Sequence, residues 1–97
     1  MKFHKGSFLV QLNYLCPRRL DYVSGWIDET NTYGFYKHNK NWKATDLKSG
    51  TRIITLPTRK GCAEWIESHQ DEIAAVKQTQ RYKTFVENFA IAAQGGE

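Results

Sequence analysis

Aromatic and basic residues alternate through the middle of the chain. Within residues 33–52, aromatic and cationic side chains are interleaved, namely Tyr33, Phe35, Tyr36 and Trp42 with Lys37, Lys40, Lys43 and Arg52. This pattern is typical of surfaces that bind polyanions, because rings stack while lysine and arginine neutralise charge. Alternation in 42–45 sends Trp42 and Ala44 to one face of a strand and Lys43 and Thr45 to the other. We therefore expect an outward basic face containing Tyr36, Lys43, Thr45 and either Arg52 or its neighbours.

Positive charge is concentrated in the same region. The net charge is +4, and residues 37–60 carry seven lysines and arginines against the single acid Asp46. Such an excess attracts nucleic acid or an acidic protein surface, although lysines on a sheet also prevent edge-to-edge pairing. The predicted binding residues are Tyr36, Lys37, Lys40, Lys43, Thr45, Lys48, Arg52, Arg59 and Lys60.

Residues that could carry catalysis are sparse. The three histidines lie far apart without metal-ligand spacing, and the glycines form no phosphate-binding loop. His38 beside Asp46 across a hairpin would make a general base, but a loop histidine and a turn-capping aspartate account for the same residues. We expect no catalytic residue, no metal and no cofactor, and hence a protein that is not an enzyme.

Two further groups have both a chemical and a structural interpretation. Cys16 and Cys62 lack Cys-x-x-Cys spacing, so no disulfide framework is expected. Cys62 follows Arg59 and Lys60 at a predicted helix start, where it is either a reactive thiol or a small buried apolar residue. Four acids of the following helical region form a solvated face or a small nucleic-acid mimic, namely Glu64, Glu67, Asp71 and Glu72.

Short strands would position the central residues. Residues 7–15 are β-rich, with Phe8, Val10, Leu12 and Tyr14 on one face, and residues 20–27 form a second strand with Gly25 as a bulge. Three more strands follow at 32–37, 42–46 and 51–56. Two turns start at Asp28 and Asp46, and in each the aspartate side chain is expected to accept a hydrogen bond from a backbone N–H of the turn. Asn31 in the first turn and Gly50 in the second would take the left-handed conformation.

After Pro57 the apolar period changes from two to 3.6. Thr58 is the predicted N-cap, Ser68 and Asp71 would cap a second helix, and residues 77–80 mark another break. The sequence thus predicts an α+β fold, with an antiparallel meander of about four to five strands (residues 7–56) covered by one or two C-terminal helices (residues 58–93). We expect residues 1–97 to form a single domain. Its predicted core places Phe35, Trp42, Ala44 and Ile54 against Trp65, Ile66 and Ile73.

Residues 33–67 resemble small proteins encoded by bacteriophages and other bacterial mobile elements. The shared pattern is an aromatic strand, a Trp-x-Ala/Val-Thr-Asp-x-x-Ser/Thr-Gly-x-x-Ile segment and a Thr-Arg/Lys-Lys helix start, matched by Trp42, Thr45, Asp46, Ser49, Gly50, Ile53, Thr58, Arg59 and Lys60. Such proteins include inhibitors of host defence systems, anti-CRISPR proteins among them. The resemblance implies stoichiometric binding to a host defence nuclease complex.

The same segment is similar to the three-stranded-sheet DNA-binding domains of phage integrases and plant ethylene-response factors. The order of three strands and a helix, the tryptophan of the middle strand and the basic sheet are shared. The Leu-Gly-x-Phe step after the third strand is replaced by Leu56-Pro57-Thr58. This resemblance implies direct DNA binding through the basic hairpins of residues 37–52.

The expected function is therefore non-enzymatic binding, with DNA binding as the alternative. The partner is a host protein or protein–nucleic acid complex, or nucleic acid directly. No membrane span or secretory signal is predicted, so we expect a location in the host cytoplasm. The chain is a monomer, or a homodimer through Tyr82, Phe85 and Phe89 of the last helix, unless these side chains pack against residues 7–15.

Overall fold

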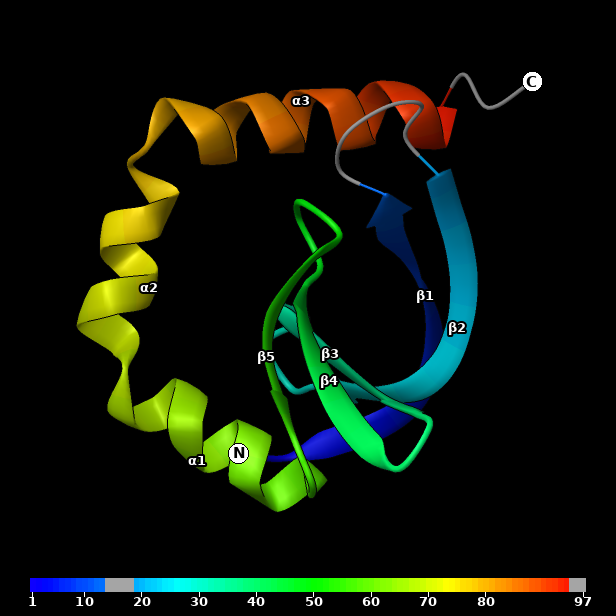
Figure 1. Cartoon of the computed structure of the whole chain (residues 1–97), viewed down its shortest axis with the longest axis vertical. Coiled ribbons are helices and arrows are strands. Elements are labelled where there is room, and N and C mark those ends of the chain that lie inside the picture. The colour runs from blue at the N-terminus through cyan, green and yellow to red at the C-terminus, as the bar shows by residue number, and fades with distance from the viewer. Residues whose placement is uncertain (14–18, 95–97) are drawn as a thin grey trace.

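The structure is a computed structural model, and it describes residues 1–13 and 19–94. Its elements are β1 (Phe3–Asn13), β2 (Arg19–Asp28), β3 (Tyr33–His38), β4 (Asn41–Asp46), β5 (Thr51–Leu56), α1 (Arg59–Ser68), α2 (Gln70–Lys77) and α3 (Gln80–Gln94). The predicted α+β class is confirmed: a five-stranded antiparallel sheet in the order β1-β2-β3-β4-β5 precedes the helices (Figure 1). The expectations for Tyr14 and Cys16 fall outside the described residues.

The β1–β2 hairpin is strongly curved, and two glycines face each other where it bends. Gly6 pairs with Gly25, and a Cβ on Gly25 would lie 2.1 Å from the carbonyl oxygen of Phe35. Only Trp26 and Ile27 of β2 pair with β3, so the rest of the hairpin turns away from the plane of β3. The register stays regular at Gly25, and the predicted bulge there is therefore wrong.

The curved hairpin makes the molecule three layers thick around β3 and β4. On one face, Phe35 and Ala44 pack against Cys62, Ala63 and Ile66 of α1. On the other face, Phe8 and Val10 of β1 pack against Tyr36, the residue after Phe35. Gln11 connects this layer to the β4–β5 turn, because its backbone N–H donates to the Gly50 carbonyl. Both faces of the central strands are thus covered.

A β-bulge in β5, opposite Ala44 and Thr45 of β4, turns two consecutive isoleucines towards the same core. Ala44 pairs with Ile54 and Thr45 with Arg52, so Ile53 has no direct partner. Because the extra residue rotates the strand locally, Ile53 and Ile54 both pack against the α1-side core. Strand alternation alone would send one of the two to the opposite face.

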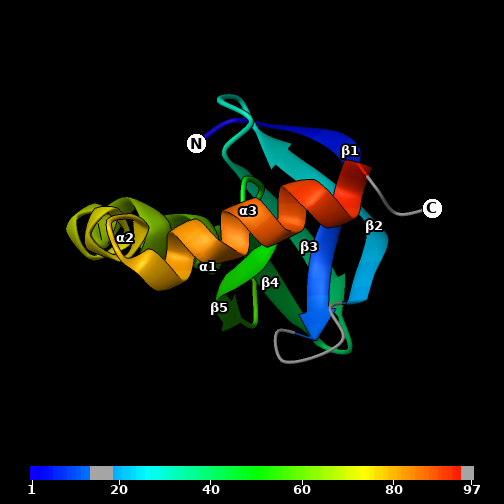
Figure 2. The ribbon, with the colours of Figure 1, turned by 90° about the horizontal axis from the view of Figure 1, so that it is seen from above.

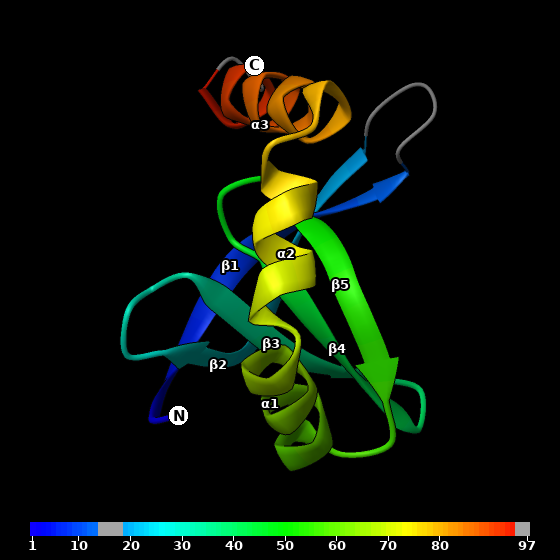
Figure 3. The ribbon, with the colours of Figure 1, turned by 90° about the vertical axis from the view of Figure 1, so that its left-hand side faces the viewer.

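The three helices follow one another around the sheet. Figure 3 shows α2 in front of β3, β4 and β5 with α1 below it, and Figure 2 shows α3 crossing over the sheet from above. Thr58 caps α1 as predicted, since its Oγ1 accepts from the N–H of Gly61 at 2.9 Å. The predicted Ser68 cap is wrong: His69 is the N-cap of α2, and the Ser68 hydroxyl donates to the Trp65 carbonyl. The breaks near 69 and 77–80 produce three helices rather than one or two.

The aspartate turns form as predicted. Oδ1 of Asp28 accepts from the N–H groups of Thr32 and Tyr33, each at 2.8 Å, and Asn31 has φ 58°. Oδ2 of Asp46 accepts from the Ser49 N–H at 3.1 Å, and Gly50 has φ 71°. Both carboxylates are nearly completely buried.

Replacing Asp28 with asparagine is expected to lower the free energy of unfolding by about 1–2 kcal/mol at pH 7. Burial raises the pKa of the Asp28 carboxyl, but the hydrogen bonds from Thr30, Tyr33 and Thr32 outweigh burial and lower it overall. A lowered folded-state pKa gives stability that is complete above the unfolded pKa of about 3.9 and is lost as the pH falls through the folded pKa. Urea denaturation should therefore show the Asp28→Asn deficit shrinking below about pH 4. Asp21→Asn at an exposed position is the control, and an equal deficit at pH 3 and pH 7 would contradict the carboxylate's role.

Candidate functional site

Two of the predicted binding residues are inside the molecule. Tyr36 is 7% exposed and Thr45 is 1% exposed, because the β1–β2 layer covers their face of β3 and β4. The Tyr36 ring meets the Phe8 ring edge-on, with 6.0 Å between centroids. The expectation of an outward face shared by Tyr36, Lys43, Thr45 and Arg52 is therefore wrong.

Three predicted cations lie apart from the others. Lys43 is half-buried and pairs with Tyr36 and Thr55 on the covered face. Lys48 lies in the β4–β5 turn, at the far end of the sheet from the β3–β4 turn, and Arg52 is opposite Thr45 towards that far end. Lys48 and Arg52 therefore do not form one surface with Lys40, and Lys43 lies on the opposite face of β4 from Trp42, the ring that contacts Arg59.

The remaining four predicted residues meet at one end of the sheet. The β3–β4 turn and the β5–α1 junction are adjacent there, because Trp42 pairs with both Lys37 and Leu56. Lys5 of β1 joins them beside Trp26, a contribution that the sequence analysis missed. We call this surface the cationic end; it consists of Lys5, Lys37, Lys40, Arg59 and Lys60.

Arg59 is held in place by aromatic rings at the cationic end. Its guanidinium carbon lies 4.5 Å from the ring centroid of Trp26, 4.8 Å from that of Phe3 and 5.9 Å from that of Trp42. Lys5 lies over the same Trp26 ring at 5.5 Å. Cation–π contacts of this kind fix a cation without neutralising it. Arg59 therefore presents a full positive charge from a restricted position.

No carboxylate of the described residues neutralises the cationic end. The ion pairs in residues 1–13 and 19–94 join Met1 to Glu67, His69 to Glu72 and Lys77 to Asp46. The four predicted acids are all exposed on α1 and α2, where Glu67 and Glu72 take part in two of these pairs. The positive charge of the cationic end is thus not cancelled by an ion-paired carboxylate of the described residues.

The two candidate reactive groups are not arranged for chemistry. His38 pairs with Asn41 at one end of the β3–β4 hairpin, whereas Asp46 pairs with Tyr33 at the other, so the predicted His38–Asp46 pair is wrong. Cys62 is fully buried, its thiol donates to the Trp42 carbonyl at 3.5 Å, and burial raises its pKa. These facts favour the interpretation of Cys62 as a small core residue. No group of His, Cys, Asp or Glu in the described ranges is arranged to hold a metal ion.

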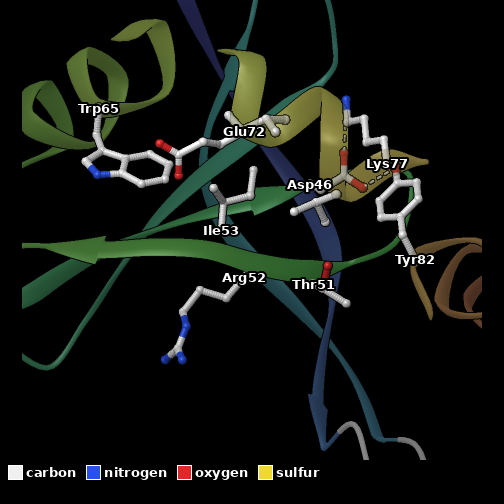
Figure 4. A pocket seen from close by; sticks show the side chains of 10 residues that line it. Asp46, Thr51, Arg52, Ile53, Trp65, Glu72, Lys77 and Tyr82 are labelled. Atoms are coloured by element: carbon white, nitrogen blue, oxygen red, sulfur yellow. Dashed lines mark hydrogen bonds and ion pairs between the residues drawn. The ribbon is translucent and has the colours of Figure 1, made fainter. Parts of the chain in front are cut away.

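A pocket of about 250 Å³ lies between β5 and the helices (Figure 4). Its walls are apolar, and they come from β5, α1 and α2: Ile53, Trp65, Ile73 and Val76. Asp46, Lys77 and Tyr82 close one end, where the Tyr82 hydroxyl donates to Oδ2 of Asp46 at 2.7 Å. Burial and this hydrogen bond raise the pKa of Tyr82, so the hydroxyl stays protonated. The sequence analysis missed this site, because Asp46 and Tyr82 are 36 residues apart.

The apolar stripe of α3 is partly used within the chain. Phe89 is buried beside the β4–β5 turn, where a Cβ on Gly50 would lie 2.5 Å from its ring, and Tyr82 binds Asp46. The stripe therefore packs against the turn rather than standing free at these two positions.

No protein-family model matches the chain, and no curated protein or solved structure is significantly similar to it. Within the described ranges, no helix combines the length and apolar character needed to cross a membrane.

Proposed function

We propose that the chain is a non-enzymatic binding protein that acts by stoichiometric docking of its cationic end onto an acidic surface of a partner protein. One observation carries this proposal: Arg59 is fixed against three rings, among four lysines, with no carboxylate of the described residues within ion-pair distance. Arginine and tryptophan in restricted positions are the residue types that dominate protein interfaces. Unneutralised charge at the rim then steers a partner of opposite sign.

The proposed partner is a host defence nuclease complex, whose inhibition follows from the resemblance to phage and mobile-element proteins. Stoichiometric inhibition needs a preformed surface rather than a catalytic centre. The buried Cys62 and the separation of His38 from Asp46 are consistent with such a role.

The alternative, sheet-type DNA binding, has weaker support. A three-stranded sheet that enters a DNA groove needs an exposed face opposite its helix. Here that face carries Tyr36 and Thr45, and both lie under the β1–β2 hairpin. Any DNA contact would have to use the cationic end instead of the hairpins of residues 37–52.

Charge reversal tests the proposal. The triple variant Lys37→Glu, Lys40→Glu, Lys60→Glu should weaken capture of host proteins from nuclease-treated lysate about tenfold or more, because three rim contacts become repulsive. The matched control Lys2→Glu, Lys48→Glu, Lys83→Glu changes the net charge equally, at exposed lysines outside the cationic end, and should retain capture. The purified captured complex should then lose nuclease activity at a 1:1 ratio with the unmodified chain. Capture that disappears on nuclease treatment, or that both variants abolish equally, would overturn the proposal.

A further inference from the structure

The pocket beside α2 leaves apolar side chains uncovered although they line a concave surface. Val76 is 56% exposed and Ile73 is half-buried, and both line the pocket opposite Ile53 of β5. No residue of α2 is fully buried, and Ile73 is its only apolar side chain that packs, partly buried, against the α1-side core among the described residues. A concave apolar surface without its own filling side chain is the usual form of a small-molecule site.

One carboxylate oxygen at the closed end of the pocket lacks a hydrogen bond. The Asp46 side chain is 5% exposed, and its Oδ2 accepts from the Ser49 N–H, the Ser49 hydroxyl and the Tyr82 hydroxyl. Its Oδ1 is buried and has no hydrogen-bond partner. The Lys77 ammonium is 4.0 Å away, which is within ion-pair range but too long for a hydrogen bond. A buried carboxylate gains most from a charged donor at hydrogen-bond distance.

From this geometry we infer that the pocket binds a small organic amine, with its ammonium on Oδ1 of Asp46 and its apolar body against Ile53, Ile73 and Val76. The ligand ammonium takes the position over Oδ1 that Lys77 holds loosely, since the Lys77 side chain is 33% exposed and can move into solvent. Apolar cavities of about 150 Å³ accept a benzene ring, so a volume of about 250 Å³ accommodates a phenyl ring with a short alkyl chain. Glu72 lines the pocket near Trp65, whereas the guanidinium of Arg52, which also lines it from β5, is directed away from the other side chains (Figure 4). This site is independent of the cationic end and of its proposed partner.

The test is a titration with 2-phenylethylamine, followed by ¹H–¹⁵N chemical shifts of the whole chain. We expect saturable shifts at Ile53, Ile73 and Val76, and none of comparable size with 2-phenylethanol or 3-phenylpropionate, which lack the ammonium. Equal binding of the alcohol would overturn the assignment of Asp46 as the recognition group. No saturable shifts at the pocket residues would overturn the site itself.

Two variants separate recognition from folding. Asp46→Asn should weaken binding of the amine about tenfold, because the charge-assisted hydrogen bond is lost, whereas Asp28→Asn removes an equally buried turn carboxylate elsewhere and should leave the affinity unchanged. Lys77→Met should tighten binding about threefold, because the competing ammonium is gone and Oδ1 is freed. Lys77 lies at the end of a helix without buried residues, so this variant tests the site even where Asp46→Asn fails to fold. Weaker amine binding by Lys77→Met would overturn the proposal.

Discussion

Replacing Gly25 with alanine is expected to destabilise the chain by about 3 kcal/mol or more, or to prevent folding altogether. The added Cβ would lie 2.1 Å from the Phe35 carbonyl oxygen, a backbone atom that cannot rotate away. Relief would require β2 to separate from β3, which it contacts through only two paired residues, Trp26 and Ile27. The bend that places the hairpin over Tyr36 depends on this close approach.

Urea denaturation of a matched pair tests this claim. Gly6 faces Gly25 in the same hairpin, but a Cβ at Gly6 would meet the terminal Cδ1 of Ile27 at 2.7 Å, and that side chain can change rotamer. Gly6→Ala should therefore cost less than about 1 kcal/mol. Equal losses for the two variants would show that general loss of glycine flexibility, rather than the collision with Phe35, limits stability.

Replacing Phe35 with alanine is expected to have the second large effect. The free energy of unfolding should fall by about 4 kcal/mol. Phe35 is completely buried between the sheet and α1, and its ring meets that of Phe3 edge-on at 5.2 Å. Removing it leaves a cavity at the junction of β1, β3 and α1, and strands paired on both sides cannot collapse into that cavity. Phe3 is also one of the rings under Arg59, so the loss should extend to the support of the cationic end.

Calorimetric unfolding measures this loss directly. Ile91→Ala is the control, because it also removes a large apolar side chain. Ile91 is 64% exposed on α3, so this variant should lower the free energy of unfolding by no more than about 0.5 kcal/mol. A Phe35→Ala loss near that of Ile91→Ala would place the core elsewhere. Phe35→Leu should give an intermediate value, because leucine fills part of the space.

Binding residues were harder to predict than the elements that carry them. The alternation of Trp42, Lys43, Ala44 and Thr45 correctly indicates two faces of β4, with Ala44 on the helix side. Whether the second face meets solvent depends on a hairpin that begins more than 30 residues earlier, and that hairpin buries Thr45 and Tyr36. A single strand's pattern contains no signal for a covering layer that is distant in sequence.

The sequence alone determined the local elements: the aspartate turns with Asn31 and Gly50, the Thr58 cap and the change of period after Pro57. Each depends on atoms only a few residues apart, so propensity and spacing suffice to predict it. The tertiary structure alone decided that the hairpin bends at Gly6 and Gly25, that Lys5 joins Arg59 on one tryptophan, and that Tyr82 closes a pocket on Asp46. These arrangements join residues far apart in the chain, and the packing of whole layers, which minimises exposed apolar surface, selects among many local possibilities.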